Sequence, residues 1–307
     1  PVREITHGAD GPNAVIATTL HQLLPENRRK VLAFADSRQE AAFFAWYLED
    51  TYDAIHSRVL VLRALRQIAR TGDAEVGLHD LALEIRELLK SEGAGDPLTD
   101  RERLQKAWVH LFRELLTDQP RISLEGVGLV RWFFYLPPDV DLPASLRGSP
   151  WNLGDEEARK VVAYLLDSLR TDHSVELDVD DSVHVQWDDL NLRGAKQTQM
   201  AIGGGKWTKA WDGAKSRRVA LLARWLERKG GSGMTEGERV AAAQVLLREI
   251  WEMASTYRGV ARLLRPSGNG HRAHPRWWRA RLLRPEDPLL RCAICGRLHA
   301  DSIGNIC

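Results

Sequence analysis

The chain has 307 residues, enough for about two domains, and its 44% hydrophobic and 28% charged residues are typical of a globular protein. This composition excludes a disordered, collagen-like or purely repetitive chain, and no apolar stretch approaches the ~18 residues of a membrane span. The 43 Lys and Arg residues balance 42 Asp and Glu residues, so net charge indicates no partner. Because the sequence begins without Met or a signal-peptide pattern and stops shortly after a Cys-x-x-Cys pair, we expect a fragment of a longer, cytoplasmic protein.

The first 50 residues predict a helix, a strand and a second helix. Apolar residues at helical spacing predict a helix over 13–24, which the following Pro-Glu-Asn interrupts. The apolar run 31–35 has the length of a buried parallel strand. Ser37 and Glu40 then form a Ser-x-x-Glu capping box, which predicts a helix over 38–50. This is the best-defined α/β unit in the sequence.

The junction between this strand and helix is a candidate phosphate site. A helix N-terminus presents free N–H groups and the positive end of its dipole to an anion. Ser37 would add a hydroxyl and Arg38 a planar cationic donor fork. The alternative is an ordinary turn in which Ser37 caps the helix and Arg38 lies in solvent. Physical chemistry alone favours this alternative, because such caps are common.

The wording of residues 30–42, Lys-Val-Leu-Ala-Phe-Ala-Asp-Ser-Arg-Gln-Glu-Ala-Ala, resembles helicase motif IV. This motif opens the second RecA-like domain of superfamily 2 DEAD/DEAH-box helicases. The segment is most similar to large prokaryotic helicases of the DUF1998 or zinc-binding type, some of which act in phage defence and others in DNA repair. The resemblance covers residues 10–50 well and the rest of the chain loosely. It implies that Ser37 and Arg38 contact a nucleic-acid backbone.

The other helicase motifs are absent from this sequence. Motif I, the DEAD/DEAH box, motif V and the arginine-bearing motif VI are not found. The resemblance therefore implies that ATP and Mg²⁺ are bound by the parent protein and not by this fragment alone. The Gly-Gly-Gly-Lys segment 203–206 does not replace motif I, because Met200 stands at the first glycine position and Trp207 at the Ser/Thr position of a P-loop. We interpret this segment as a flexible loop.

Helical periodicity dominates the middle of the chain. Apolar residues at helical spacing predict three helices between residues 54 and 118, marked by the segments 59–68, 81–89 and 104–115. Further helices are expected over 156–170, 214–229 and 236–255. Thr235 and Glu238 form a capping box at the start of the last of these helices.

Charge changes sign along the C-terminal half. Residues 171–190 hold seven acids and no Lys or Arg, and valines on either side of an Asp-Asp turn predict a hairpin there. These acids lack the Gly and Glu of a calcium loop, so we interpret them as a solvated hairpin. Residues 256–297 instead contain ten arginines and two acids. This basic tail predicts strands over 277–283 and 289–293, joined by a Pro-Glu-Asp-Pro turn.

The basic tail is a second candidate nucleic-acid surface, because arginines bind phosphates and tryptophan can stack on bases. The candidate contacts are Arg276, Trp277, Arg279 and Arg281. Together with the last three predicted helices, the tail could form a winged helix whose wing is 277–293. The alternative is a solvated face whose tryptophans lie in the core. Trp277 and Trp278 are adjacent on a strand, so we expect one to point inward and one outward.

The three cysteines, Cys292, Cys295 and Cys307, all lie in the last sixteen residues. This clustering favours a reducing compartment and a metal knuckle over a disulfide framework. Cys-x-x-Cys-Gly is typical of structural zinc, with Cys307 as the third ligand and a Cys beyond this sequence, or less typically His299, as the fourth. The alternative is three free thiols. Zn²⁺ is expected more strongly in the parent protein than in this chain.

These observations predict an α/β start, a partial RecA-like domain over 1–52, followed by a helical insertion over 53–150. A winged-helix-like region is expected over 151–290 and a truncated zinc ribbon over 291–307. We therefore expect a fragment of an ATP-dependent DNA helicase or translocase, active in phage defence or DNA repair. Its expected partners are DNA, the missing first RecA-like domain and other subunits of such a system, and no membrane. The alternative is a non-enzymatic DNA-binding or adaptor module of winged-helix plus zinc-ribbon type.

Overall fold

The computed structural model describes part of the chain, in ranges separated by gaps. The described residues are 16, 19–20, 23–25, 38–71, 75–92, 97–117, 123–180, 183–192, 194–228, 233–284, 286–287, 290–291 and 298–299. They form a mixed α/β fold in which helix predominates, as expected. The predicted strand over 31–35, Ser37 and the three cysteines lie outside these ranges, and the RecA-like, winged-helix and zinc-ribbon assignments remain predictions.

The chain divides into two compact units, residues 1–60 and 61–307, and the division falls inside a helix. This helix, α2 (Arg38–Thr71), is 34 residues long. The sequence predicted a helix over 38–50 and another marked by 59–68. The structure joins them, because neither Gly nor Pro interrupts the segment.

The helices α3 (Leu78–Glu92) and α4 (Asp100–Leu115) pack against each other in the larger unit. They confirm the two helices predicted from the apolar segments 81–89 and 104–115. α4 begins at a capping box, in which Glu102 N–H donates to Thr99 Oγ1 at 3.3 Å and Thr99 N–H donates to the Glu102 carboxylate at 2.7 Å. The box satisfies donors that the first turn of a helix leaves open.

A three-stranded antiparallel sheet joins distant parts of the larger unit. Its strands are β1 (Val76–Gly77), β9 (Trp278–Leu282) and β2 (Val130–Phe134), in the order β1-β9-β2. Side chains alternate across the sheet. Residues that face the core are buried: Val130, Trp132, Phe134, Trp278 and Ala280. Residues of the other face are only half-buried: Arg131, Phe133, Arg279 and Arg281.

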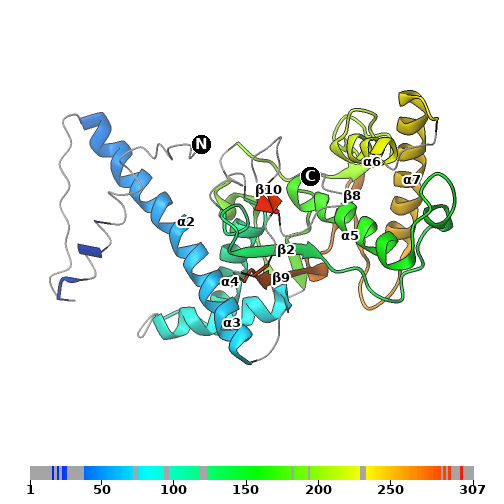
Figure 1. The fold of residues 1–307 in the computed structure, drawn as a ribbon. Coiled ribbons are helices and arrows are strands. Elements are labelled where there is room, and N and C mark those ends of the chain that lie inside the picture. Colours follow the sequence, from blue (N-terminus) through cyan, green and yellow to red (C-terminus); the bar gives the residue numbers. More distant parts are fainter. Residues whose placement is uncertain are drawn as a thin grey trace. The chain divides into compact units, whose positions relative to one another are not determined.

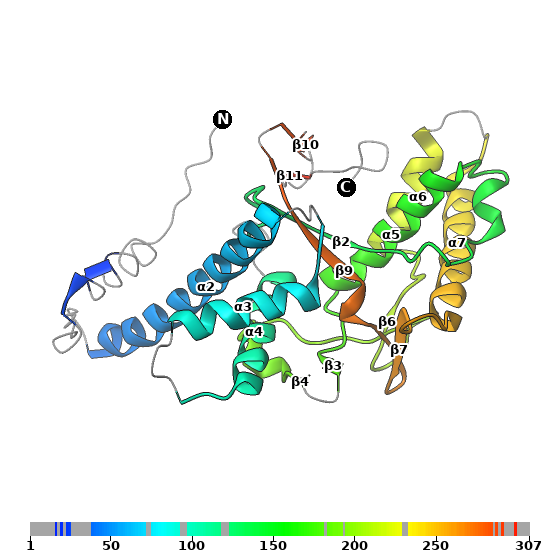
Figure 2. The ribbon, with the colours of Figure 1, turned by 90° about the horizontal axis from the view of Figure 1, so that it is seen from below.

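In the views of Figures 1 and 2, α3 and α4 lie to one side of the strands β2 and β9, and α5, α6 and α7 lie to the other. α5 (Asp155–Thr171) packs on β2, and α6 (Arg217–Arg228) packs on α7 (Glu236–Thr256). These confirm the last three predicted helices. The predicted capping box of Thr235 and Glu238 is also present at the start of α7.

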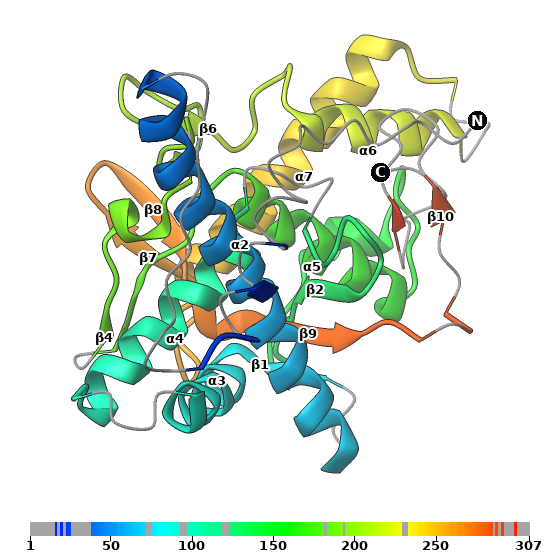
Figure 3. The ribbon, with the colours of Figure 1, turned by 90° about the vertical axis from the view of Figure 1, so that its left-hand side faces the viewer.

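A second, four-stranded sheet lies beside α7 and contacts it through its edge strand β7. Its strands, in spatial order, are β6 (Lys209–Ala210), β5 (Met200–Ala201), β8 (Gly270–Ala273) and β7 (Leu264–Ser267). Figure 3 shows α6 and α7 above β2 and β9.

The short 3-10 helices are η2 (Ala144–Arg147), η3 (Trp187–Leu190) and η4 (Pro275–Trp277). No helix in the described ranges combines the length and apolar character that crossing a membrane requires.

Two further hairpins test predictions about the charged segments. β3 (Asp178–Asp180) pairs with β4 (Val183–His184), so the acidic hairpin is present, but its first strand lies at 178–180 and not at the predicted 175–177, where Val175 instead bridges Ala273. The strands predicted over 277–283 and 289–293 are present as β9 and β10 (Leu290–Arg291), but they do not form one wing, because β9 pairs with β1 and β2 while β10 pairs with β11 (Leu298–His299). A lone two-stranded hairpin buries little apolar surface, whereas the three-stranded sheet buries Trp278 completely.

Candidate nucleic-acid interface

The half-buried face of the sheet β1-β9-β2 gathers arginines and aromatic rings. We call Arg131, Phe133, Tyr135, Arg279 and Arg281 the outer arginine face. The antiparallel register places Arg131 directly opposite Arg281, and Phe133 directly opposite Arg279. Tyr135 continues the same alternation one residue beyond β2, and its N–H donates to the Trp277 carbonyl oxygen at 2.6 Å. Directly opposite residues of antiparallel strands share a face, so these side chains are neighbours.

Two arginines of the outer arginine face lie over aromatic rings. The guanidinium carbon of Arg279 is 3.6 Å from the ring centroid of Tyr135, and that of Arg131 is 5.4 Å from the ring centroid of Phe133. A guanidinium stacked on a ring keeps its N–H donors in its own plane, where they can reach an anion. The Arg279 and Arg281 side chains are 33% and 31% exposed, so solvent reaches both.

Two carboxylates form long ion pairs with arginines of this face. The Arg279 guanidinium lies 3.8 Å from the Glu75 carboxylate, and the Arg281 guanidinium lies 3.8 Å from the Asp287 carboxylate. These distances are those of ion pairs and are too long for hydrogen bonds. Exposed pairs of this kind contribute little to stability. At these distances the two carboxylates leave guanidinium N–H donors of Arg279 and Arg281 that an anion can bind.

The four predicted nucleic-acid contacts of the basic tail differ in their exposure to solvent. Arg276 is exposed, and Arg279 and Arg281 belong to the outer arginine face. Trp277 is buried, and its indole N–H donates to the Arg262 carbonyl oxygen at 2.9 Å. Trp278 is also buried, so the expectation that one of the two tryptophans points outward is wrong. Trp277 lies in η4 instead of a strand, so strand alternation does not apply to it. Its burial prevents base stacking.

The remaining predicted site residues cannot be placed in this interface. Arg38 begins α2, while Ser37, Cys292, Cys295 and Cys307 lie outside the described residues. Within the described ranges, no group of three His, Cys, Asp or Glu side chains is arranged to hold a metal ion. The zinc prediction therefore depends only on the spacing of the cysteines in the sequence.

Sequence reasoning missed the contribution of β2. Arg131, Phe133 and Tyr135 belong to a segment, Val-Arg-Trp-Phe-Phe-Tyr, whose β-branched and aromatic residues favour a strand. That composition could have identified the strand. Nothing in the local sequence indicates that its partner would be β9, more than 140 residues later in the chain.

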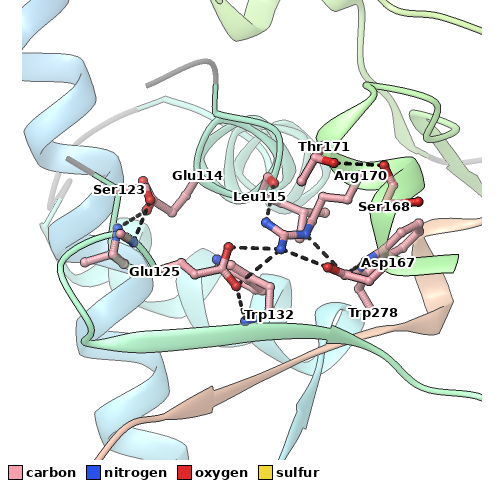
Figure 4. A network of polar contacts seen from close by, with 12 residues as sticks. Glu114, Leu115, Ser123, Glu125, Trp132, Asp167, Ser168, Arg170, Thr171 and Trp278 are labelled. Atoms are coloured by element: carbon pink, nitrogen blue, oxygen red, sulfur yellow. Dashed lines mark hydrogen bonds and ion pairs between the residues drawn. The ribbon is translucent and has the colours of Figure 1, made fainter. Parts of the chain in front are cut away.

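A buried ion network supports the sheet from its inner side (Figure 4). Arg170 of α5 donates to the carboxylates of Glu125 at 2.9 Å and Asp167 at 3.1 Å. Asp167 also accepts from the Trp278 indole N–H at 2.7 Å, and Glu125 accepts from the Trp132 backbone N–H at 3.3 Å. The network therefore connects α5, β2 and β9 on the face of the sheet that carries Trp278.

The charge of Arg170 is maintained by its partners. Its side chain is only 7% exposed. Burial alone would lower the pKa of Arg170, but the Asp167 and Glu125 carboxylates raise that pKa above its ordinary value. The guanidinium is thus fully engaged inside the protein and has no role at the surface.

Comparisons with known proteins give no relative from which a function could be transferred. No family model matches the chain, and neither a curated protein nor a solved structure is similar to it. What the chain binds must therefore be inferred from its own residues, and the outer arginine face is the described surface that most resembles a ligand site.

Proposed function

We propose that the chain binds a nucleic-acid backbone through the outer arginine face, as a segment of an ATP-dependent DNA helicase or translocase. The observation that carries the binding proposal is the pair Arg279 and Arg281, two residues apart on β9, whose side chains are about a third exposed and lie 3.8 Å from their carboxylate partners. A phosphate could accept shorter, charge-assisted hydrogen bonds from these guanidinium groups. Arg131, directly opposite Arg281, places a third arginine on the same face.

The neighbouring rings favour a nucleic acid over a small anion. Phosphates recur along a nucleic-acid backbone, so Arg279 can bind a second phosphate beside the one held by Arg131 and Arg281. Phe133 and Tyr135 each lie under one of these arginines, and this stacking reduces the side-chain entropy lost on binding.

The helicase class depends on the resemblance of residues 30–42 to motif IV, with Ser37 and Arg38 as further backbone contacts. In that proposal the parent protein holds ATP and Mg²⁺ with motifs that this sequence lacks. Cys292, Cys295 and Cys307 would supply thiolates for a structural Zn²⁺. DNA and the first RecA-like domain are the proposed partners, in a phage-defence or DNA-repair system within the cytoplasm.

The binding proposal is tested by comparing two double variants in a salt series. Arg279→Ala/Arg281→Ala removes two charges from the outer arginine face, and Arg217→Ala/Arg224→Ala removes two exposed charges from α6. Fluorescence anisotropy with labelled single-stranded and duplex DNA measures Kd between 50 and 200 mM salt. We expect the sheet variant to lose at least about tenfold in affinity, and the α6 variant to lose much less.

The salt dependence gives an independent criterion. Losing two phosphate contacts should reduce the slope of log K against log salt by about 1.4 for single strands and about 1.8 for duplex DNA. Equal losses in the two double variants would mean that binding follows general positive charge, and the proposed interface would be wrong. A loss confined to the α6 variant would favour the winged-helix adaptor alternative.

The helicase class needs a separate measurement on the full-length parent protein. DNA-stimulated ATP hydrolysis that weakens in the Arg279→Ala/Arg281→Ala variant is expected for a helicase or translocase. A parent protein that binds DNA but hydrolyses no ATP would instead be a non-enzymatic DNA-binding or adaptor module.

A further inference from the structure

An exposed tryptophan stands at the tip of a tight turn, far along the chain from the outer arginine face. Trp207 is 72% exposed. Gly205 N–H donates to the Thr208 carbonyl oxygen at 3.1 Å, and Thr208 N–H donates to the Gly205 carbonyl oxygen at 3.4 Å. Lys206 and Trp207 are therefore the two tip residues of a closed two-residue turn. Such turns favour Gly, Asn or Asp, so the turn itself does not require a tryptophan.

Hydrogen bonds and two glycines at positive φ shape this turn. Gly203 and Gly204 have φ angles of 69° and 68°, in the left-handed region that glycine adopts without strain. A Cβ atom at Gly204 would lie 2.9 Å from the backbone nitrogen of Ala210, so the strand beside the turn approaches closely. The buried Asp212 carboxylate accepts from Gly203 N–H at 2.7 Å and from Arg248 Nε at 2.7 Å.

The segment around the turn is basic. Residues 194–217 contain five Lys and Arg residues and a single acid, Asp212. That acid is buried and paired with Arg248, so it does not neutralise the surface. The Lys206 ammonium nitrogen lies 5.1 Å from the ring centroid of Trp207, which places a positive charge directly beside the exposed indole. Lys209, also exposed, follows two residues later, and its ammonium nitrogen lies 3.8 Å from the Asp172 carboxylate, so Lys206 is the cation that remains beside the indole.

We propose that the tip Lys206-Trp207 is a stacking contact for an unpaired base of single-stranded nucleic acid, with Lys206 on an adjacent phosphate. This inference rests on the proposed function and adds a strand type and a second contact point. An indole held on a fixed turn stacks on a base with little loss of entropy, and every base presents a flat face to it. The surrounding positive charge matches a polyanion and does not match an apolar protein groove.

The test separates base stacking from backbone binding. Kd is measured for a thymidine 20-mer and for an abasic 20-mer, which has the same phosphates and no bases. Wild-type protein is expected to prefer the thymidine strand, and Trp207→Ala should reduce that preference by about fivefold to a hundredfold. Trp207→Phe should keep much of the preference. Val260→Ala, a change at another exposed apolar residue (79% exposed), should leave it unchanged.

The outcomes distinguish this inference from the proposed function. Arg279→Ala/Arg281→Ala should weaken the binding of both 20-mers by a similar factor, because both contain the same phosphates. If Trp207→Ala retains the wild-type preference, the stacking contact is wrong while the backbone interface stands. If the wild-type protein binds neither strand, the proposed function itself fails. If Trp207→Ala loses binding to phosphatidylserine vesicles and binds DNA as the wild type does, the tip is a membrane contact and the inference is overturned.

Discussion

The two faces of the sheet β1-β9-β2 use arginine in opposite ways. On the inner side, Arg170 is 7% exposed and donates to two carboxylates at 2.9 Å and 3.1 Å. On the outer side, Arg279 and Arg281 are about a third exposed, and their nearest carboxylates are 3.8 Å away. Buried charges need close partners, because water no longer solvates them. The inner arginine therefore stabilises the fold, while the outer arginines keep donors available for a ligand.

The largest effect is expected from breaking the inner network. Arg170→Met removes the buried cation and leaves the half-buried carboxylates of Asp167 and Glu125 without their partner. The free energy of unfolding should fall by about 3–5 kcal/mol. Urea denaturation followed by circular dichroism measures this change.

An exposed ion pair supplies the control for Arg170→Met. Arg147 lies 2.6 Å from Asp155, and both side chains are more than half exposed, so Arg147→Met should change the free energy of unfolding by less than about 1 kcal/mol. Equal effects of the two substitutions would remove the distinction between the inner and outer arginines.

A histidine next to β9 makes the stability of this region depend on pH. His274 is buried and accepts a hydrogen bond from Arg276 N–H through Nδ1 at 3.1 Å. Burial, together with the charges of Arg265 and Arg276, lowers the pKa of His274 to about 4. The unfolded chain binds this proton near its ordinary pKa of about 6.5. Stability is therefore fully present above about pH 6.5 and is lost as the pH falls toward 4, by at most about 3 kcal/mol.

His274→Asn tests this pH dependence. The asparagine side-chain oxygen can still accept from Arg276 N–H at the start of η4, but it does not titrate. Urea unfolding between pH 4 and 7.5 should show a shallower loss of stability for the variant than for the wild type. Burial also lowers the pKa of His271, assisted by Arg262, so part of the wild-type dependence should remain. Identical slopes in the two proteins would show that His274 does not contribute.

A smaller effect is expected at the contact between β9 and the inner network. Trp278→Phe keeps an aromatic ring in the core and removes the indole N–H that donates to Asp167. The free energy of unfolding should fall by about 2 kcal/mol, from the lost hydrogen bond to a charged group and a small cavity. Trp277→Phe removes a hydrogen bond to a neutral carbonyl and should have the smaller effect. A reversed order would indicate that Trp278 contributes only packing.

The predictions from sequence succeeded where the signal is local. Helices α3 to α7 follow from apolar residues at helical spacing, and the capping box of Thr235 and Glu238 follows from four consecutive residues. The pairing of β9 with β2 could not be predicted, because the information lies in two segments more than 140 residues apart. The basic tail indicated Arg279 and Arg281 through charge density alone. Nothing in the local sequence connects Glu125 with Asp167 and Arg170, and only the fold shows that the two half-buried carboxylates meet around the buried guanidinium.

The smallest stability effect is expected on the outer arginine face itself. Arg279→Ala removes the stacking on Tyr135 and a long ion pair with Glu75, both of them partly exposed to solvent. The free energy of unfolding should change by less than about 1 kcal/mol. Thermal and urea unfolding of the variant measure this change against the wild type.

A small change in the free energy of unfolding is expected for an arginine that binds a ligand, whereas a large change is expected for an arginine that stabilises the fold. A residue whose removal weakens DNA binding while the fold is almost unaffected acts through its ligand. If Arg279→Ala instead lost about 3 kcal/mol, as expected for Arg170, the stacked guanidinium would be part of the fold, and weaker DNA binding by the variant would only reflect unfolding. The changes in the free energy of unfolding for Arg170→Met and Arg279→Ala, measured in the same buffer, therefore decide whether the two faces of this sheet differ in role as they differ in geometry.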